Sequence, residues 1–248
     1  MNKEEALKKV NADGYYLNRL SPELKADKEV VLAAISNDAF LLKFASDALK
    51  NDRDVVLAAV KQKGYVLEFA SAELKADREV VLAAVQQNGE ALKYASDELK
   101  ENKEVVLAVV SNDGFALKLV SDALKNDRDV VLAAVSNDGR VLQYAPKELQ
   151  ADIEVALAAV QQNGRAYSYV GDSLKTNKEV ALAAVKQDFN IYYVLDPTLQ
   201  KEPELMKIKE AHDAELRNKP YDDDYGGSRR RTRRSRSRKS RKARKTRR

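Results

Sequence analysis

The sequence predicts an all-α protein: an α-solenoid of eight short-helix repeats, a terminal capping helix and a disordered basic tail. Three observations predict it. A 25-residue pattern recurs without insertion through residues 2–201. Helix-capping residues and a glycine recur at fixed places in that pattern. Each unit also carries an apolar block that it is too small to bury alone. We therefore expect repeats at 2–201, a capping helix at 202–219, and an acidic linker with an Arg/Ser-rich tail at 220–248.

The first position of every unit predicts the start of a helix. It is Asp or Asn throughout, and such a side chain accepts a hydrogen bond from a free N–H of the first turn. Glu or Asp follows within that turn, where helix electrostatics favours it. The block VVLAAV comes next and is apolar nearly all round, which predicts a short helix buried on most sides. The eight capping residues are Asn2, Asp27, Asp52, Asp77, Asn102, Asp127, Asp152 and Asn177.

A glycine twelve residues after the cap marks the end of this helix in six units. We expect it to adopt the left-handed conformation that often ends helices. Ala39 and Phe189 replace it in two units, so a different helix end is expected there. A second short helix follows, as in EALKYA, and a single turn that carries a leucine closes each unit. The glycines are Gly14, Gly64, Gly89, Gly114, Gly139 and Gly164.

Leucine fills one position of the first helix in all eight units, and alanine fills the next position in seven. The small alanine allows close helix packing. The first unit has Glu5, Lys8 and Lys9 where later units are apolar, as a solvent-facing solenoid end requires. The residues expected to cover the last unit are Leu205, Met206, Ile208, Ala211 and Leu216. The leucines are Leu7, Leu32, Leu57, Leu82, Leu107, Leu132, Leu157 and Leu182, and the alanines run from Ala33 to Ala183 in steps of 25.

The repeat resembles a known family. Residues 74–96 carry the pattern L-K-x-D-(K/R)-E-V-V-L-A-A-V-x-x-N-G-x-A-L-x-Y-A-S, which is similar to the repeat catalogued as domain of unknown function 4116. The resemblance covers about four-fifths of the chain. It implies tandem helical units and brings no established activity or catalytic residue. The architecture also looks like that of leucine-rich-variant helical repeats.

Composition excludes several kinds of site. The chain has no Cys and a single His, His212, which excludes disulfides, thiolate metal sites, cysteine nucleophiles and His-based metal clusters. No apolar run reaches the ~20 residues that a membrane span needs, and the N-terminus lacks the apolar core of a signal peptide. We therefore expect an intracellular protein of the cytoplasm or nucleus, without a cofactor. A virion location stays open if the chain is viral.

Two positions of the second helix are candidates for binding. The first is aromatic at Phe44, Phe69, Tyr94, Tyr144 and Tyr169, and Leu119 and Val194 replace the ring elsewhere. A ladder of rings can stack on bases, but the aliphatic replacements favour a core layer, which Tyr167, Tyr192 and Tyr193 would thicken.

The second position follows the glycine and varies through every residue type, as binding surfaces of solenoids do. We call this second set the ridge, and the alternative is that it is unconstrained surface. The ridge comprises Tyr15, Phe40, Tyr65, Glu90, Phe115, Arg140, Arg165 and Asn190.

No pattern of catalytic residues emerges. Two facing carboxylates can do acid–base chemistry, but the same acid recurs in the first helical turn of each later unit, as at Glu29 and Glu79. Helix electrostatics explains that better. We interpret His212 as an ordinary surface residue of the terminal helix. A phosphate-binding loop, a dinucleotide fingerprint and a nucleophile elbow are all missing. We therefore expect no enzymatic activity.

The C-terminal tail carries the strongest chemical signal. Residues 229–248 hold 14 Lys or Arg and no acid, so the rest of the chain has 30 basic and 39 acidic side chains and a net charge of −9. Arginine pairs with phosphate, and such a chain neutralises phosphates without reading sequence. A nuclear-import receptor, an anionic membrane surface and the acidic body are alternative partners. The basic residues are Arg229, Arg230, Arg231, Arg233, Arg234, Arg236, Arg238, Lys239, Arg241, Lys242, Arg244, Lys245, Arg247 and Arg248.

Serines among these arginines are candidate phosphorylation sites, namely Ser235, Ser237 and Ser240. A phosphate there would add negative charge and weaken phosphate binding. The tail is also similar to basic tails of proteins from large DNA viruses. These features predict a non-enzymatic repeat scaffold for protein–protein interaction, whose tail binds nucleic acid non-specifically or directs nuclear import. The alternatives are a nucleic-acid packaging or virion structural protein, and an accessory module.

Overall fold

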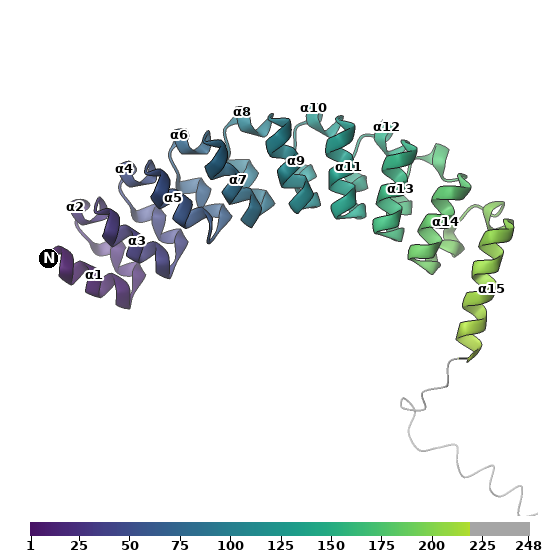
Figure 1. Ribbon diagram of the computed structural model, residues 1–248, viewed down its shortest axis with the longest axis horizontal. Helices are drawn as coiled ribbons and strands as arrows, with labels where there is room; N and C mark the ends of the chain where they lie inside the picture. Colours follow the sequence, from purple (N-terminus) through teal and green to yellow (C-terminus); the bar gives the residue numbers. More distant parts are fainter. Residues whose placement is uncertain (219–248) are drawn as a thin grey trace, which may run out of the picture. The chain divides into compact units, whose positions relative to one another are not determined.

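The computed structural model describes residues 1–218, and their helices confirm the all-α solenoid. No strand occurs in this described part. Each unit contains a long helix, a 3-10 helix and a short closing turn, in that order. Residues 1–206 form one compact body, and a second begins at Lys207. In Figure 1 the long helices of the first body stand side by side along an arc, with the short helices on its convex edge.

The bounds of the elements repeat with the predicted period. The long helices are α1 (Lys3–Ala12), α3 (Lys28–Asn37), α5 (Arg53–Val60), α7 (Arg78–Gln87), α9 (Lys103–Asn112), α11 (Arg128–Asn137), α13 (Ile153–Gln162) and α14 (Lys178–Gln187). The 3-10 helices are η1 (Gly14–Arg19), η2 (Ala39–Phe44), η3 (Gly64–Phe69), η4 (Gly89–Tyr94), η5 (Gly114–Leu119), η6 (Gly139–Tyr144), η7 (Gly164–Tyr169) and η9 (Phe189–Val194). The closing turns are α2 (Pro22–Lys25), α4 (Asp47–Lys50), α6 (Ala72–Lys75), α8 (Asp97–Lys100), α10 (Asp122–Lys125), α12 (Lys147–Gln150), η8 (Asp172–Leu174) and η10 (Leu199–Lys201), and α15 (Pro203–Asn218) follows.

The predicted caps form as hydrogen bonds. Asp77 Oδ1 accepts from the backbone N–H of Glu79 at 2.9 Å and of Val80 at 3.0 Å. The asparagine cap Asn102 makes the equivalent pair of bonds to its own first turn, both at 3.1 Å. Each cap satisfies donors that the helix itself leaves free. The first position of the unit therefore fixes where every long helix begins.

The second helix of each unit is a 3-10 helix rather than an α-helix. A ten-residue α-helix such as α3 is about 15 Å long at 1.5 Å per residue. The six residues of η2 cover about 12 Å in a 3-10 helix but only about 9 Å in an α-helix. The tighter helix therefore returns the chain along more of the long helix. Its Leu41 and Leu42 are both buried.

The recurring glycines do not have the predicted left-handed conformation. None of the six has a φ between +20° and +160°, and each begins a 3-10 helix. They permit close approach between units instead. A Cβ on Gly139 would lie 2.1 Å from the carbonyl oxygen of Ala159 in the next unit, and one on Gly64 would lie 2.2 Å from that of Ala84. A side chain at either position would force neighbouring units apart.

The two units without this glycine end their long helices as the others do, so the expected difference there is wrong. α3 ends at Asn37, and Asp38 follows in the usual extended conformation although Ala39 carries a methyl group. The irregular end lies one unit later, because α5 stops after 8 residues where its neighbours have 10. Phe189 belongs to the last repeat, where its ring stacks on Tyr192 with the planes 3° apart.

The core lies between the long helices and the 3-10 helices. Every principal contact between elements joins members of the same unit or of adjacent units, as a solenoid requires. The long helices are buried on fewer sides than predicted, since Leu32 and Ala33 of α3 are only half-buried. The buried residues of the second unit are Val30, Val31, Ala34, Ile35, Ala39, Leu41, Leu42, Ala45 and Leu49.

The start of α15 has the features of a ninth long helix. Glu202 and Glu204 take the places of a cap and a first-turn acid, and Lys178 pairs with them at 3.4 and 2.9 Å. Leu205 is fully buried. The other residues expected to cover the last unit are less buried: Ile208 is half-buried, Ala211 is exposed, and Met206 and Leu216 are 45% and 53% exposed.

Candidate interaction surfaces

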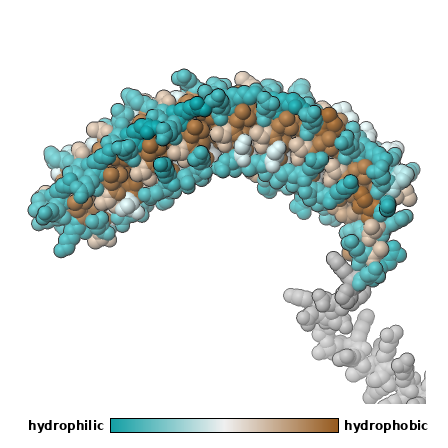
Figure 2. All heavy atoms as spheres, in the orientation of Figure 1, coloured by the Kyte–Doolittle hydropathy of each residue, from teal (hydrophilic) through white to brown (hydrophobic). Residues whose placement is uncertain are grey.

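The long helices present a row of apolar side chains on the side that the 3-10 helices do not cover. The invariant leucines from Leu7 to Leu182 are half-buried, and the alanines beside them are half-buried or, at Ala108, exposed. We call these leucines and alanines together the leucine stripe. In Figure 2 apolar side chains recur along the arc between hydrophilic margins. The prediction of a helix buried nearly all round missed this surface. The constancy of its leucine, beside inner positions that vary between Val, Ile and Ala, was the available signal.

Ion pairs connect consecutive units along one margin of the stripe. The first residue of a long helix is Lys or Arg in seven units, and it reaches the first turn of the next long helix. Lys28 Nζ lies 2.9 Å from both Asp52 and Asp54, and Lys103 Nζ lies 2.8 Å from Asp127 and 2.7 Å from Asp129. The other basic residues of this ladder are Lys3, Arg53, Arg78, Arg128 and Lys178. The carboxylates beside the caps thus join the units.

This ladder changes the acidity of the capping residues. The hydrogen bond from Lys103 lowers the pKa of Asp127 below its usual value, and the guanidinium of Arg128 does the same to Asp152. The carboxylates in turn raise the pKa of Arg128. All these pairs are partly exposed, so each contributes little stability by itself.

The ladder is interrupted between α13 and α14. Ile153 occupies the position of the basic residue and is 36% exposed. The capping residue of α14 is the neutral Asn177, whose Oδ1 accepts from the N–H groups of Glu179 and Val180 at 2.9 and 3.1 Å. No ion pair within the described residues involves the carboxylate of Glu179. One acid of the ladder is therefore left without the cation that its counterparts have.

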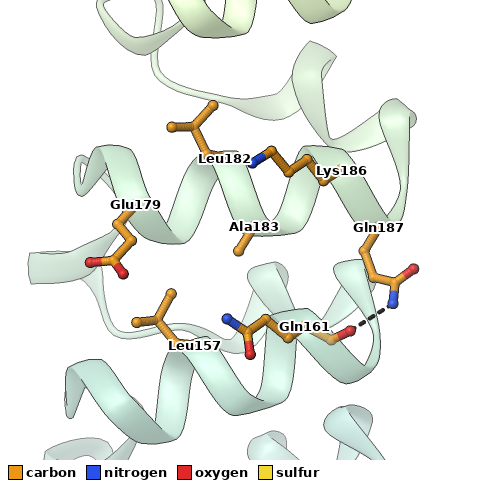
Figure 3. Close-up of a pocket in the computed structure, with 7 residues that line it drawn as sticks. All are labelled: Leu157, Gln161, Glu179, Leu182, Ala183, Lys186 and Gln187. Carbon is orange, nitrogen blue, oxygen red and sulfur yellow. Dashed lines mark hydrogen bonds between the residues drawn. The ribbon is translucent and has the colours of Figure 1, made fainter.

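A groove lies at this interruption, with a volume of about 440 Å³. In Figure 3 Leu157 of α13 and Ala183 of α14 point toward one another, with Glu179 at one end of the groove and Gln187 at the other. Gln187 closes that end by donating a hydrogen bond from Nε2 to the backbone oxygen of Gln161 at 2.6 Å. The groove is lined by Leu157, Gln161, Glu179, Leu182, Ala183, Lys186 and Gln187.

The ridge lies at the second position of the 3-10 helices, and its side chains contact neighbouring units. Phe40 packs edge-on against Phe69, and Phe115 packs in the same way against Tyr144, with ring centroids 6.2 and 6.3 Å apart. These contacts give the ridge a structural role alongside any role in binding. The polar members pair as follows: Tyr15 with Asp38 at 3.4 Å, Tyr65 with Glu90 at 3.0 Å, Arg140 with Asp138 at 2.6 Å, and Arg165 with Asp188 at 3.2 Å. Asn190 is exposed and donates to Asp188 at 2.9 Å.

The aromatic position of the 3-10 helices is less buried than the predicted core layer. Phe44, Phe69 and Tyr94 are half-buried, and Tyr144 and Tyr169 are at the exposed limit with 36% and 37%. Tyr193 is 60% exposed and does not belong to a core layer. Tyr167 and Tyr192 are buried because they occupy the position of Leu42, and their hydroxyls donate to the backbone oxygens of Lys175 and Gln200 at 2.7 and 2.8 Å.

The other predicted sites divide between described and undescribed residues. His212 is half-buried on α15. Within residues 1–218 no cluster of His, Cys, Asp and Glu is arranged to hold a metal ion, and no helix is both long and apolar enough to cross a membrane. The basic tail at 229–248 and the serines Ser235, Ser237 and Ser240 lie outside the described residues.

Comparisons with known proteins place the repeat in a family. No curated protein and no solved structure matches the chain. The family described as "Domain of unknown function (DUF4116)" matches residues 2–50, 27–75, 52–100, 77–122, 102–150 and 152–200. These matches start at capping residues and mostly span two consecutive units, in phase with the long helices. The chain belongs to this family of helical repeats.

Proposed function

We propose that the solenoid is a non-enzymatic scaffold that binds partner proteins along the leucine stripe. The single observation that carries this is the invariance of a leucine that packing buries only in part. Inner positions tolerate Val, Ala or Ile, whereas the half-exposed position is Leu in all eight units. An extended apolar surface bordered by polar side chains is typical of a protein-binding site.

The carboxylates support a scaffold more than an enzyme. The first-turn acids from Glu29 to Glu154 are each held by a cation of the preceding unit. A general acid or base needs access to a substrate proton and a pKa matched to its task. Each of these carboxylates is instead engaged by a Lys or Arg of the preceding unit, and the same kind of pair recurs between consecutive units. The ridge is a second candidate docking surface because its residue types vary from unit to unit.

The test of the scaffold uses the alanines of the stripe. Ala108 is exposed and Ala83 and Ala133 are half-buried, so the aliphatic stem of a lysine at these positions can lie along the surface with its ammonium group in water. We expect Ala83→Lys, Ala108→Lys and Ala133→Lys together to keep the helical content and to abolish capture of partner proteins from the native cells. The matched control places the same three charges on exposed alanines of the short helices, as Ala48→Lys, Ala72→Lys and Ala123→Lys. Equal capture by both triple variants would contradict docking on the stripe.

For the tail we propose non-specific binding of nucleic acid, which the 14 basic residues at 229–248 favour, or nuclear import. A packaging or virion structural protein is the alternative in which this binding is the main function. The full chain and a 1–227 truncation are titrated with duplex DNA at several salt concentrations. We expect the tail to supply the affinity, with a log–log salt slope of roughly −0.9 per phosphate neutralised. Undiminished binding by the truncation would reject it.

A further inference from the structure

The missing cation between α13 and α14 marks a site on the stripe. A Lys or Arg joins each other pair of consecutive long helices within residues 1–206, and Lys178 makes the equivalent contact to the start of α15. Ile153 alone breaks that series. The break leaves Glu179 with an exposed carboxylate at one end of an apolar groove.

We infer that this groove binds a segment of a partner protein that presents an Arg or Lys side chain to Glu179. This rests on the proposed scaffold function and names the chemistry of the partner. The partner's cation takes the place that Lys103 or Arg128 has elsewhere in the ladder. Its aliphatic stem lies against the apolar wall formed by Leu157 and Leu182, as the stems of long basic side chains commonly do. The exposed Ile153 occupies the helix position from which a basic residue reaches its acid in the other units.

The charges of the groove restrict the segment further. Lys186 also lines the groove and follows Glu179 by seven residues, about 10 Å along α14 at 1.5 Å per residue. A chain in the polyproline II conformation has three residues per turn and a rise of about 3.1 Å per residue, so side chains three residues apart lie on one face about 9 Å apart. The complementary segment therefore carries a basic residue, two aliphatic residues and an acidic residue in succession. The basic tail of this chain fits poorly, since Ala243 is its one aliphatic residue and it has no acid.

The experiment uses the full chain and a defined probe. The probe is the tetrapeptide Arg-Leu-Leu-Glu with an acetylated N-terminus and an amidated C-terminus, and Gln-Leu-Leu-Glu is its control. Ile153 is one of four isoleucines in the chain, so a methyl-labelled isoleucine reports on the groove by NMR. We expect the Arg peptide to shift the Ile153 methyl signal with at least about fivefold higher affinity than the Gln peptide, the upper range for an exposed ion pair.

Three variants test the role of the missing cation between α13 and α14. Glu179→Gln removes the negative charge and lowers the affinity for the Arg peptide about fivefold. Ile153→Lys restores the ladder, keeps the fold and competes with the peptide for Glu179, which a leucine methyl signal reports. Arg78→Ile recreates the arrangement elsewhere, because its ion-pair partner is Glu104 and the cap of that helix is the neutral Asn102. Its new isoleucine methyl should respond to the Arg peptide and much less to the Gln peptide.

Several outcomes would overturn the inference. They are equal binding of the Arg and Gln peptides, unchanged binding by Glu179→Gln, or binding that appears only after residues 228–248 are removed, which would make the tail the occupant. The scaffold is judged separately by partner capture. If the three stripe lysines abolish capture and Ile153→Lys leaves it unchanged, the scaffold stands and the inference falls. If the stripe lysines have no effect on capture, the scaffold itself is wrong.

Discussion

Replacing Gly139 with Ala tests whether the recurring glycine allows two units to approach. The added Cβ would lie 2.1 Å from the Ala159 oxygen, more than 1 Å short of the ordinary contact distance of 3.4 Å, and 3.0 Å from its carbonyl carbon. Both neighbours are backbone atoms of α13, which cannot rotate away. Gly139→Ala must therefore move the sixth and seventh units apart.

The size of the effect follows from two opposing terms. Overpacking costs about 3 kcal/mol at the upper end of its usual range. Alanine also restricts the unfolded chain to fewer conformations than glycine, which stabilises the folded state by up to about 1 kcal/mol. The net loss is about 2 kcal/mol, which lowers the melting temperature of a chain of this size by roughly 4–8 °C. Thermal unfolding followed by far-UV circular dichroism measures it.

Two further variants distinguish a glycine that is needed for close approach between units from one that is needed for a left-handed backbone conformation. Gly14→Ala should cost less, because its nearest neighbours are side-chain atoms, the flexible end of Leu41 at 2.7 Å and Asn37 Cβ at 2.9 Å, and the backbone oxygen of Ala34 lies 3.3 Å away. Gly139→Asn should be at least as damaging as Gly139→Ala, although Asn is well tolerated in left-handed positions. A melting temperature of Gly139→Ala equal to or above that of the unchanged chain would refute the reasoning.

Four other predictions follow from the ladder, the caps, the tyrosines and the ridge. Because the folded state lowers the pKa values of Asp127 and Asp152, their contribution to stability is complete above about pH 5 and disappears as pH falls below about 4; urea midpoints that are constant from pH 7 to 3 would oppose this. Asp77→Ala loses a cap and about 1 kcal/mol in urea unfolding, whereas Asp77→Asn keeps the cap and loses less. Tyr167→Phe leaves the Lys175 carbonyl without its donor and costs about 1 kcal/mol by the same measurement; an unchanged midpoint would mean that water replaces the hydroxyl. Phe40→Ser, Tyr65→Ser and Phe115→Ser together should lower the melting temperature and leave partner capture intact, and the reverse pattern would move the docking surface to the ridge.

The sequence predicts the unit length, the caps and the phase of the repeat, because these depend on local chemistry. An Asp or Asn before an apolar block needs only its own first turn to act, as Asp77 does. The role of the glycine was not predictable in this way. Its conformation is ordinary, and the constraint on Gly139 comes from Ala159, which lies 20 residues later in the chain.

The candidate site depends even more on three-dimensional context. A block such as VVLAAV gives no sign of which residues a second layer will cover, and only the 3-10 helices decide that Val30 is buried and Leu32 half-exposed. Ile153 is likewise an unremarkable apolar residue in the sequence. Only the structure shows that the equivalent residue Arg128 reaches Asp152 and Glu154 of the next unit, and that Ile153 therefore interrupts a series of ion pairs.

Site-specific photocrosslinking tests the scaffold most directly. A benzophenone side chain is placed at the exposed Ala108 on the stripe or, as a control, at the exposed Ala123 on a short helix. Both proteins are irradiated in the native cells, and crosslinked partners are identified by mass spectrometry. The account predicts that the same partner crosslinks at Ala108 and not at Ala123. Crosslinks that form at Ala123 while Ala108 gives none would contradict it.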